Sequence, residues 1–380
     1  MRYLTAGESH GRALIAILEG VPAGLKISRE DFDREAARRM SGYGRGGRMK
    51  IESDKAEILS GMRGGYTTGA PIGIMIQNRD YPIWVRATDP FTGDVSLKKL
   101  TAVRPGHADY AGCVKYGFDD ARNILERASA RQTAIRVALG VVCKRYLAEL
   151  GIFIGSHVTV IGGVRGAYVA ATARELERAD SDPVRCMDAS ASEKMCARID
   201  EARAAGDTVG GKFQVIAEGV PVGIGSHTEY FRKLDYRLGG ELMSLQSVKS
   251  VSIGLGADCE SRPGSDVHDA MYLKNGRIVR RSNNAGGIEG GISNGENIVI
   301  NCVVKPIPTL MAGLPTVDIA QLKETLSQPE RSDVCAVPAA AVVAEAITAY
   351  VLADVISETL GGDRMDEVKE RFLKKVADAK

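Results

Sequence analysis

The sequence lacks any long uninterrupted hydrophobic run. Its most apolar stretch, residues 337–356, contains Glu345 and Asp354, whereas a membrane-spanning helix needs about 20 predominantly apolar residues. The first twelve residues do not resemble a signal peptide, because acidic, basic and histidine side chains interrupt them. We therefore expect a soluble, cytoplasmic protein with no membrane partner.

An excess of charge of one sign is also missing. Lys and Arg total 50 and Asp and Glu total 48, so the net charge is +2 and no overall field attracts nucleic acid or membrane. The seven cysteines are odd in number and contain no Cys-x-x-Cys pair, which favours reduced thiols over a disulfide framework. We expect no metal site and no nucleic-acid partner.

No linker or low-complexity stretch divides the chain. Hydrophobic residues make up 44% and charged residues 26%, which is typical of a globular protein with a sizeable core. We expect one domain, residues 1–380, made of two intertwined halves. Gly42, Gly44 and Gly47 match the spacing of a dinucleotide-binding loop. Because a helix precedes them and no βαβ unit follows, we reject a Rossmann site there.

Glycine is abundant in residues 281–309, where five glycines precede a β-branched run at 298–304 and then Lys305, Pro306 and Pro308. The run predicts a strand, and glycine would let a ligand touch the main chain directly. The segment is either a glycine-rich hairpin of a sheet protein or a cradle for a flat or phosphorylated ligand, with Lys305 as its charge.

Two parts of the sequence repeat each other. Residues 64–69 and the strand after them match residues 290–295 and the strand after those, while residues 126–129 and 330–333 each precede a long apolar helix. The pattern predicts two related halves with one site between them. Chance similarity of glycine-rich turns remains the alternative.

Hydrophobic periodicity predicts the remaining elements. A helix capped by Ser28 and Asp31 should end near Met40. A helix at 338–360 is apolar nearly all round, so we expect helices between antiparallel sheets, an α+β fold. The other expected strands are 13–18, 152–165 and 209–220, and the other expected helices are 131–150, 192–205, 235–247 and 365–380. Residues 78–104 read as a long polar loop, a lid or an assembly arm.

Basic residues crowd the end of the first helix and the loop after it: Arg34, Arg38, Arg39, Arg45, Arg48 and Lys50. Arginine binds phosphate and carboxylate with a planar fork, so a small polyanion fits this loop. The alternative is a solvated basic face at a helix C-terminus. His107 follows a Pro-Gly turn beside Arg104, which suits a proton donor to a leaving oxyanion, although a lone histidine is more often structural.

Several segments, taken together, resemble the chorismate synthase family from end to end. The matching motifs are GESHG at 7–11, RMSGYGRGGRMKIESD at 39–54, RPGHAD at 104–109, RASARQTAIRVALG at 127–140, SNNAGGIEGGISNG at 282–295, KPIPT at 305–309 and RSDVCAVPAAAVVAEA at 331–346. The resemblance implies helices sandwiched between antiparallel sheets in a homotetramer. It implies an enzyme that binds reduced FMN and converts 5-enolpyruvylshikimate 3-phosphate to chorismate and phosphate, with NADPH as a flavin reductant. The chain is compact like bacterial members, so an intrinsic flavin reductase is not expected.

The resemblance also assigns residues by motif. It implies that His10 protonates reduced flavin, that His107 assists phosphate departure, and that Asp333 is an acid near flavin N5. The residues implied for FMN are Arg127, Ala128, Ser129, Gln246, Ser247, Gly290, Lys305, Pro306, Ile307, Pro308, Thr309 and Arg331. Those implied for NADPH are Arg39 and Arg45, and those for the anionic substrate are Arg48 and Arg131. Ala128 stands where other members have serine, so a hydroxyl contact is absent there.

Two other classes of function compete with this assignment. In the first, the arginines serve NADPH, and the protein is a flavin reductase or electron carrier without a substrate site. In the second, the loop at 34–50 binds RNA, although only Tyr43 could stack on bases. NADPH consumption without phosphate release would favour the first class over a lyase. A steeply salt-dependent oligonucleotide affinity would support the second.

Overall fold

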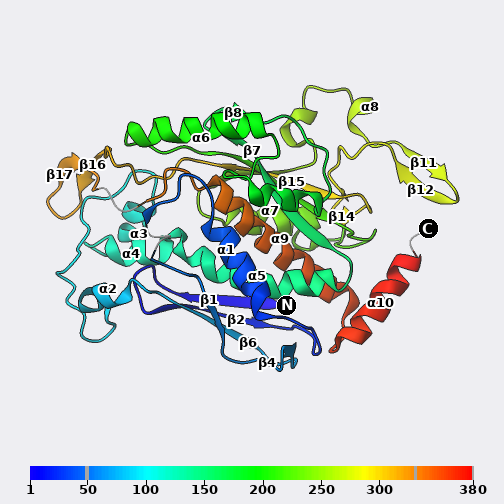
Figure 1. The fold of residues 1–380 in the computed structure, drawn as a ribbon, viewed down its shortest axis with the longest axis horizontal. Coiled ribbons are helices and arrows are strands. Elements are labelled where there is room, and N and C mark those ends of the chain that lie inside the picture. Colours follow the sequence, from blue (N-terminus) through cyan, green and yellow to red (C-terminus); the bar gives the residue numbers. More distant parts are fainter. Residues whose placement is uncertain (48–50, 329–331, 379–380) are drawn as a thin grey trace.

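The computed structural model describes residues 1–47, 51–328 and 332–378 and contains two antiparallel sheets of more than two strands (Figure 1). The four-stranded sheet has the order β1-β2-β6-β3, and its strands are β1 (Arg2–Gly7), β2 (Ala13–Glu19), β6 (Ile72–Gln77) and β3 (Ala56–Ile58). The five-stranded sheet has the order β10-β15-β9-β7-β8, and its strands are β10 (Val248–Ile253), β15 (Ile298–Val304), β9 (Gly211–Glu218), β7 (Phe153–Ile161) and β8 (Val164–Arg165).

Long helices pack against both sheets and against each other (Figure 1). The helix α5 (Thr133–Ala148) packs on β2 and β6, and α9 (Val337–Leu360) packs on β7 and β9. The two helices also pack on each other at Gly140, where an added Cβ would lie 2.4 Å from Ala346 Cβ. Further helices beside this pair are α1 (Arg29–Met40) and α7 (Leu234–Met243). The predicted mixed helix-and-sheet class is confirmed.

The capping box predicted for α1 is present. Ser28 accepts a hydrogen bond from the Asp31 backbone N–H at 3.2 Å, and Asp31 accepts one from the Ser28 backbone N–H at 2.9 Å. The helix ends at Met40, as predicted. A reciprocal box of this kind satisfies N–H groups that the first helical turn leaves without partners.

The helix α9 is the only one in the described part of the chain that is long and apolar enough to cross a membrane. Our expectation that no segment reaches that length was therefore too strict. Of its most apolar 18-residue window, 94% is buried inside the molecule, so this apolar surface is covered by the protein itself. Two acidic residues of this helix, Glu345 and Asp354, form ion pairs with Arg38 and with the N-terminal amino group of Met1, respectively.

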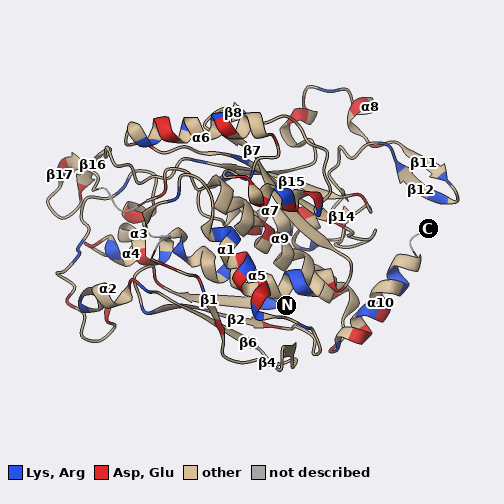
Figure 2. Ribbon diagram, in the orientation of Figure 1, with Lys and Arg blue, Asp and Glu red and all other residues tan. Residues whose placement is uncertain are grey.

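Smaller elements cover the ends of the two layers. The helices are α2 (Tyr81–Thr88), α3 (Asp109–Tyr116), α4 (Arg122–Ala128), α6 (Ala189–Ala204), α8 (Gly264–Val267) and α10 (Met365–Asp378). The two-stranded hairpins are β4–β5 (Met62–Arg63, Tyr66–Thr67), β11–β12 (Met271–Lys274, Arg277–Arg280), β13–β14 (Ile288–Glu289, Ile292–Ser293) and β16–β17 (Pro315–Asp318, Lys323–Leu326). Figure 2 shows acidic and basic residues mixed along α6 and α10.

The repeat seen in the sequence corresponds to two similar hairpins. Gly64 and Gly65 join β4 to β5, with φ of 60° and 83°, and Gly290 and Gly291 join β13 to β14, with φ of 60° and 91°. Each pair has two successive left-handed residues, which a two-residue hairpin turn requires and glycine supplies. Each hairpin leads into an inner strand of its sheet, β6 or β15.

Three element predictions need correction. Residues 78–104 are not one loop, because α2 begins at Tyr81; Pro82 in its first turn is tolerated there, since those N–H groups have no helical acceptor. The predicted helix 131–150 starts as a 3₁₀ turn at Ala130–Gln132 before α5. The helix predicted at 235–247 ends at Met243, and Ser247 has a left-handed φ of 69°.

Candidate active site

His10 lies in the loop between β1 and β2 and is buried. Glu126 on α4 holds it twice, accepting from the His10 backbone N–H at 2.7 Å and lying 2.8 Å from its Nδ1. The ring stacks on Trp84 of α2, with centroids 3.9 Å apart. Burial alone would raise the pKa of Glu126, but its contacts with His10 and Arg122 outweigh burial and lower it. The carboxylate therefore stays charged and fixes the orientation of the imidazole.

Asn78 connects this loop to the start of α5. Its Nδ2 donates to the carbonyl oxygens of Glu8 at 2.9 Å and Gly11 at 2.7 Å. Its Oδ1 accepts from Arg131 Nε at 3.0 Å. One amide therefore sets the distance between the loop that carries His10 and the guanidinium predicted to face substrate.

Arg131 and Arg39 are buried and share the carboxylate of Asp54. Arg39 Nη1 donates to Asp54 Oδ2 at 2.6 Å, and Arg131 Nη1 donates to Asp54 Oδ1. Arg131 Nη2 also donates to Glu52 at 3.1 Å. Burial, opposed by Asp54, lowers the pKa of Arg39 to about 10. A guanidinium has five N–H donors, so Arg131 keeps two beyond the three bonds described here.

Asp333 lies in the segment before α9 and contacts the glycine-rich loop after α1. Its Oδ1 accepts from the Gly46 backbone N–H at 2.6 Å, and its Oδ2 lies 2.9 Å from Arg45 Nη1. The N-cap of α9 is Ala336, which makes no side-chain cap bond. Asp333 therefore does not cap this helix.

His107 occupies an exposed turn before α3. Its Nδ1 lies 2.5 Å from Asp109 Oδ1 and 3.0 Å from Arg104 Nη2. Burial would raise the pKa of Asp109, but hydrogen bonds from His107 and Arg104 outweigh it and hold that pKa well below its ordinary value. Because an ionised carboxylate only accepts, the contact with Asp109 requires a proton on Nδ1, while Nε2 lies 3.4 Å from Arg104 Nη2.

The segment from Lys305 to Thr309 packs against this turn. Lys305 Nζ donates to the Gly106 carbonyl oxygen at 2.5 Å, and Thr309 Oγ1 accepts from Arg104 at 3.3 Å. The Lys305 backbone N–H donates to the Ser247 carbonyl oxygen at 2.9 Å. Three predicted segments, which are far apart in the sequence, therefore meet beside His107.

Thr208 and Val209, which precede β9, join the two groups of residues. Thr208 Oγ1 donates to the Ile307 carbonyl oxygen at 2.7 Å, and the Val209 backbone N–H donates to the Val334 carbonyl oxygen at 2.9 Å. The Lys305–Thr309 segment and the Asp333 segment therefore lie on either side of the same short stretch.

The other predicted residues fall into three sets. Arg127 lies beside the His10 loop, since it donates to the carbonyl oxygens of Thr5 and Gly7 at 3.0 and 3.2 Å; Ala128 and Ser129 follow it at the end of α4. Gly290 lies apart, at the tip of the β13–β14 hairpin. Arg48 and Arg331 lie outside the described residues. The roles of all these residues stay predictions.

Gln246 allows a test of whether a flavin fits the residues present. Its Oε1 is buried and has no hydrogen-bond partner in the described part of the chain, although such groups are normally paired. An isoalloxazine ring offers N–H donors. Lys305, whose backbone N–H is bonded to the Ser247 carbonyl oxygen, offers a cation for a phosphate. This donor and acceptor set fits FMN. Among the described residues no cluster of His, Cys, Asp and Glu could hold a metal ion.

A cavity of about 580 Å³ lies elsewhere, between α7 and α9. Arg237, Tyr350 and Asp354 are among its lining residues, and none of the predicted site residues lines it. The cavity therefore does not coincide with the predicted site residues.

Sequence reasoning missed the carboxylates and the amide that hold the predicted cations and histidines. They are Glu52, Asp54, Asn78, Asp109 and Glu126. Asp54 and Asp109 end two of the motifs noted above, and their position next to arginine-rich stretches was the available signal. Of the basic residues noted at 34–50, Arg38 and Arg39 are paired with carboxylates inside the protein, whereas the side chain of Arg34 is 65% exposed. Arg48 and Lys50 lie outside the described residues, so the anion site predicted there stays a prediction.

The ionisation of Asp109 should make the stability of the folded protein depend on pH. A carboxylate whose folded pKa is depressed stabilises the protein above its unfolded pKa of about 3.9, and this stability is lost as the pH falls through the folded value. We expect Asp109→Asn to lower the Tm at pH 7, because each hydrogen bond to a charged group contributes roughly 1.5–3 kcal/mol. The difference in Tm between Asp109→Asn and the wild type should become smaller below about pH 4.

The matched control for this experiment is Asp119→Asn. Asp119 pairs with Lys99 on the surface, with 79% of its side chain exposed, and exposed pairs contribute little. Thermal melts of the three proteins between pH 7 and pH 3 make the comparison. Equal Tm values for Asp109→Asn and wild type at pH 7 would show that Asp109 contributes nothing through its charge.

Comparisons with known proteins agree with one another. The sequence model of the family described as chorismate synthase matches residues 1–357. The chain is 52% identical over 375 residues to chorismate synthase of Caldicellulosiruptor saccharolyticus, covering 98% of both chains. It is also 52% identical over 382 residues to chorismate synthase of Geobacter sulfurreducens, covering 98% of this chain and 97% of the relative.

A solved structure of a chorismate synthase is also similar. It matches with a TM-score of 0.80 and 41% sequence identity, over 100% of this chain and 98% of the other. At this identity and coverage the likeness extends to the whole fold.

Proposed function

The chain belongs to the chorismate synthase family, and from that premise we propose that it converts 5-enolpyruvylshikimate 3-phosphate to chorismate and inorganic phosphate, with reduced FMN bound. The observation that carries this proposal is that the Lys305–Thr309 segment, which contacts the His107 turn, and the Asp333 segment both bond to the stretch at Thr208 and Val209. The His10 loop is linked to Arg131 through Asn78. The reaction is a 1,4-elimination, in which the bond from C3 to the phosphate oxygen and the bond from C6 to hydrogen break.

The roles of the protein's groups follow from the charge of the substrate. A phosphate and two carboxylates need cations, and we assign this role to Arg48 and Arg131. His107, held through Nδ1 by Asp109, donates a proton from Nε2 to the departing phosphate. His10 and Asp333 hold protons on the flavin side. FMN, when bound through Gln246, Ser247, Lys305 and Thr309, supplies the electron density that helps the carbon–oxygen bond break.

Several finer features belong to the same proposal. The protein is a cytoplasmic homotetramer of one domain with two pseudo-symmetric halves, a sandwich of helices between sheets, and Arg39 and Arg45 take part in recognising NADPH. The similarity of the β4–β5 and β13–β14 hairpins supports the division of the domain into two related halves. On the four-stranded sheet, Leu4 is 74% exposed and Ile17 is 52% exposed. Exposed apolar side chains of this kind support association with further copies of the chain.

The redox state of the flavin tests the proposed reaction. We expect turnover with FMN photoreduced under nitrogen, essentially none with oxidised FMN, and no net loss of reduced flavin as product accumulates. Free phosphate and product absorbance are followed together, with substrate and reduced FMN without protein as the control. Stoichiometric oxidation of flavin per chorismate would contradict a lyase, and steady NADPH consumption without phosphate release would favour the flavin reductase.

A further inference from the structure

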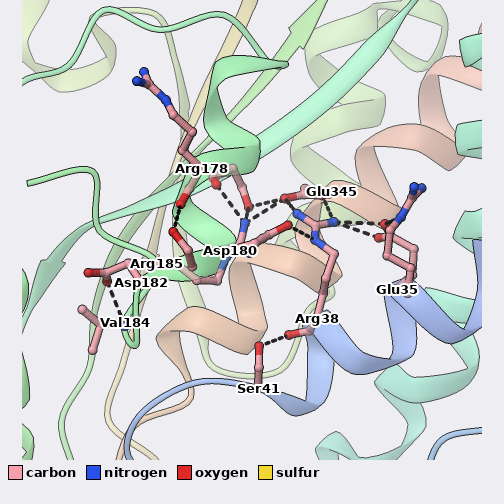
Figure 3. A network of polar contacts seen from close by, with 12 residues as sticks. Glu35, Arg38, Ser41, Arg178, Asp180, Asp182, Val184, Arg185 and Glu345 are labelled. Atoms are coloured by element: carbon pink, nitrogen blue, oxygen red, sulfur yellow. Dashed lines mark hydrogen bonds and ion pairs between the residues drawn. The ribbon is translucent and has the colours of Figure 1, made fainter.

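A buried network of charged side chains lies next to the site, where α1, α5, α9 and β7 meet (Figure 3). It contains three cations and three carboxylates: Arg38, Lys144, Arg185, Glu35, Asp180 and Glu345. The function proposed above uses none of them. Because the charges balance, the network is neutral as a whole and each group has a partner of opposite sign.

Glu345, on α9, is the centre of the network and is fully buried. It accepts from Arg38 Nη1 at 2.7 Å and Arg38 Nη2 at 2.9 Å, from Lys144 Nζ at 2.7 Å, and from Ser156 Oγ at 2.5 Å. Burial would raise the pKa of Glu345, but these cations outweigh burial and lower it strongly. The carboxylate therefore stays charged and binds the Arg38 fork in a fixed plane.

Arg38 uses all three of its nitrogens in the network. Its Nε donates to Asp180 Oδ2 at 2.8 Å, and its Nη1 also donates to Glu35 Oε2 at 2.9 Å. Figure 3 shows Arg38 extending from α1 between Asp180 and Glu345. A guanidinium bound on three sides cannot change rotamer without breaking ion pairs, so it fixes the rotation of the last turn of α1.

That turn carries Arg39, which belongs to the site. Successive residues of a helix point about 100° apart, so Arg38 reaches the network while Arg39 reaches Asp54 at 2.6 Å. Rotation or sliding of the last turn would move both guanidinium groups together. The geometry of Arg38 therefore determines where Arg39 lies.

The same network holds the loop that follows α1. The Tyr43 backbone N–H donates to the Pro183 carbonyl oxygen at 2.7 Å. Arg185, two residues later, donates to Asp180 and to Glu345, and its backbone has an unusual φ of 60°. A left-handed arginine is disfavoured and persists only where its surroundings fix it. The loop fixed in this way places Gly46 and Arg45 on Asp333.

We propose that Arg38 and Glu345 are positioning residues, which fix the end of α1 and the loop at 42–47 so that Arg39 holds Asp54, the shared partner of the substrate-facing Arg131, and Arg45 stays on Asp333. The kinetic part of this inference rests on the proposed function. A purely stabilising role is the weaker explanation, because burying ion pairs costs nearly as much in lost hydration as their attraction returns.

The test is Arg38→Lys, which keeps the charge and loses the fork. We expect KM for the phosphorylated substrate to rise about 10-fold with kcat within about 3-fold, which is less than the roughly 10²-fold effect of a 1 Å displacement at the reacting atoms. Amide exchange at Ser41, Tyr43 and Gly46 should become roughly 10-fold faster, because these amides lie in the helix end and the loop that Arg38 is proposed to fix.

The matched control is Arg237→Lys. Arg237 also links α9 to a neighbouring helix, α7, through Glu358 at 2.7 Å and through Asp354, but near the other end of α9. We expect wild-type KM and wild-type exchange at 41–47 in this variant. If Arg38→Lys loses no more than this control in KM and exchange, the positioning role is wrong.

Two further results keep the test decisive. If Arg38→Lys does not fold, Asp180→Asn replaces it, since Asp180 is a third exposed and its loss should be tolerated. The same faster exchange at 41–47 is then expected, and unchanged exchange overturns the proposal. Exchange needs no turnover, so a wild-type protein that releases no phosphate would contradict the proposed function without deciding the positioning role.

Discussion

His107→Ala is expected to reduce turnover by ~10²–10⁴-fold, the range typical of a lost general acid, while FMN binding stays nearly intact. The side chain of His107 is 15% exposed, and its Nδ1 lies 2.5 Å from Asp109 Oδ1, which fixes the orientation of the ring. Removing the ring takes away the proton donor but leaves Lys305 bonded to the Gly106 carbonyl oxygen at 2.5 Å. Anaerobic phosphate release and FMN titration measure the two quantities separately.

His10→Ala is the contrasting variant. Its ring is buried against Trp84 and bonded to Glu126, so its loss should slow turnover and also alter the spectrum or protonation of bound reduced flavin. Trp84 is the only tryptophan of the chain, and its fluorescence reports directly on this ring. If both histidine variants keep wild-type rates between pH 6 and pH 8, the roles assigned to them are wrong.

Local patterns predicted the elements well wherever a local cause was sufficient. The strand at 298–304 has the predicted bounds because its β-branched side chains alternate between two packed faces. The capping box of Ser28 and Asp31 needs only residues three apart, so the sequence contains all of it. The helix α2 was missed because a short segment with Pro82 and several polar residues has no clear period.

The partners of the site residues could not be read in the same way. Arg131 pairs with Asp54, 77 positions away, and Asp333 pairs with Gly46, 287 positions away. No spacing rule connects residues so distant, because their contact depends on how α1, α5 and α9 pack. The motifs indicated the segments that contain the site residues, whereas the carboxylate that pairs with each arginine depends on how the helices pack.

Asp333→Asn is expected to lower turnover by at least ~10²-fold with little change in Tm, assembly or FMN affinity. The amide oxygen of asparagine can still accept from the Gly46 backbone N–H, as Asp333 Oδ1 does at 2.6 Å. What the substitution removes is the carboxylate that can take up and release a proton. Since Ala336 is the N-cap of α9, loss of a helix cap does not enter the comparison.

The ion pair with Arg45, at 2.9 Å, is a second way in which Asp333→Asn could slow the enzyme, and Arg45→Gln isolates it. That variant breaks the same pair and keeps the carboxylate. If Asp333 moves a proton, Arg45→Gln should keep the limb of the pH–rate profile that reports the carboxylate, and Asp333→Asn should lose it. Equal losses of rate and the same profile in both variants would reduce Asp333 to an anchor for Arg45. A fully active Asp333→Asn protein would remove it from the mechanism altogether.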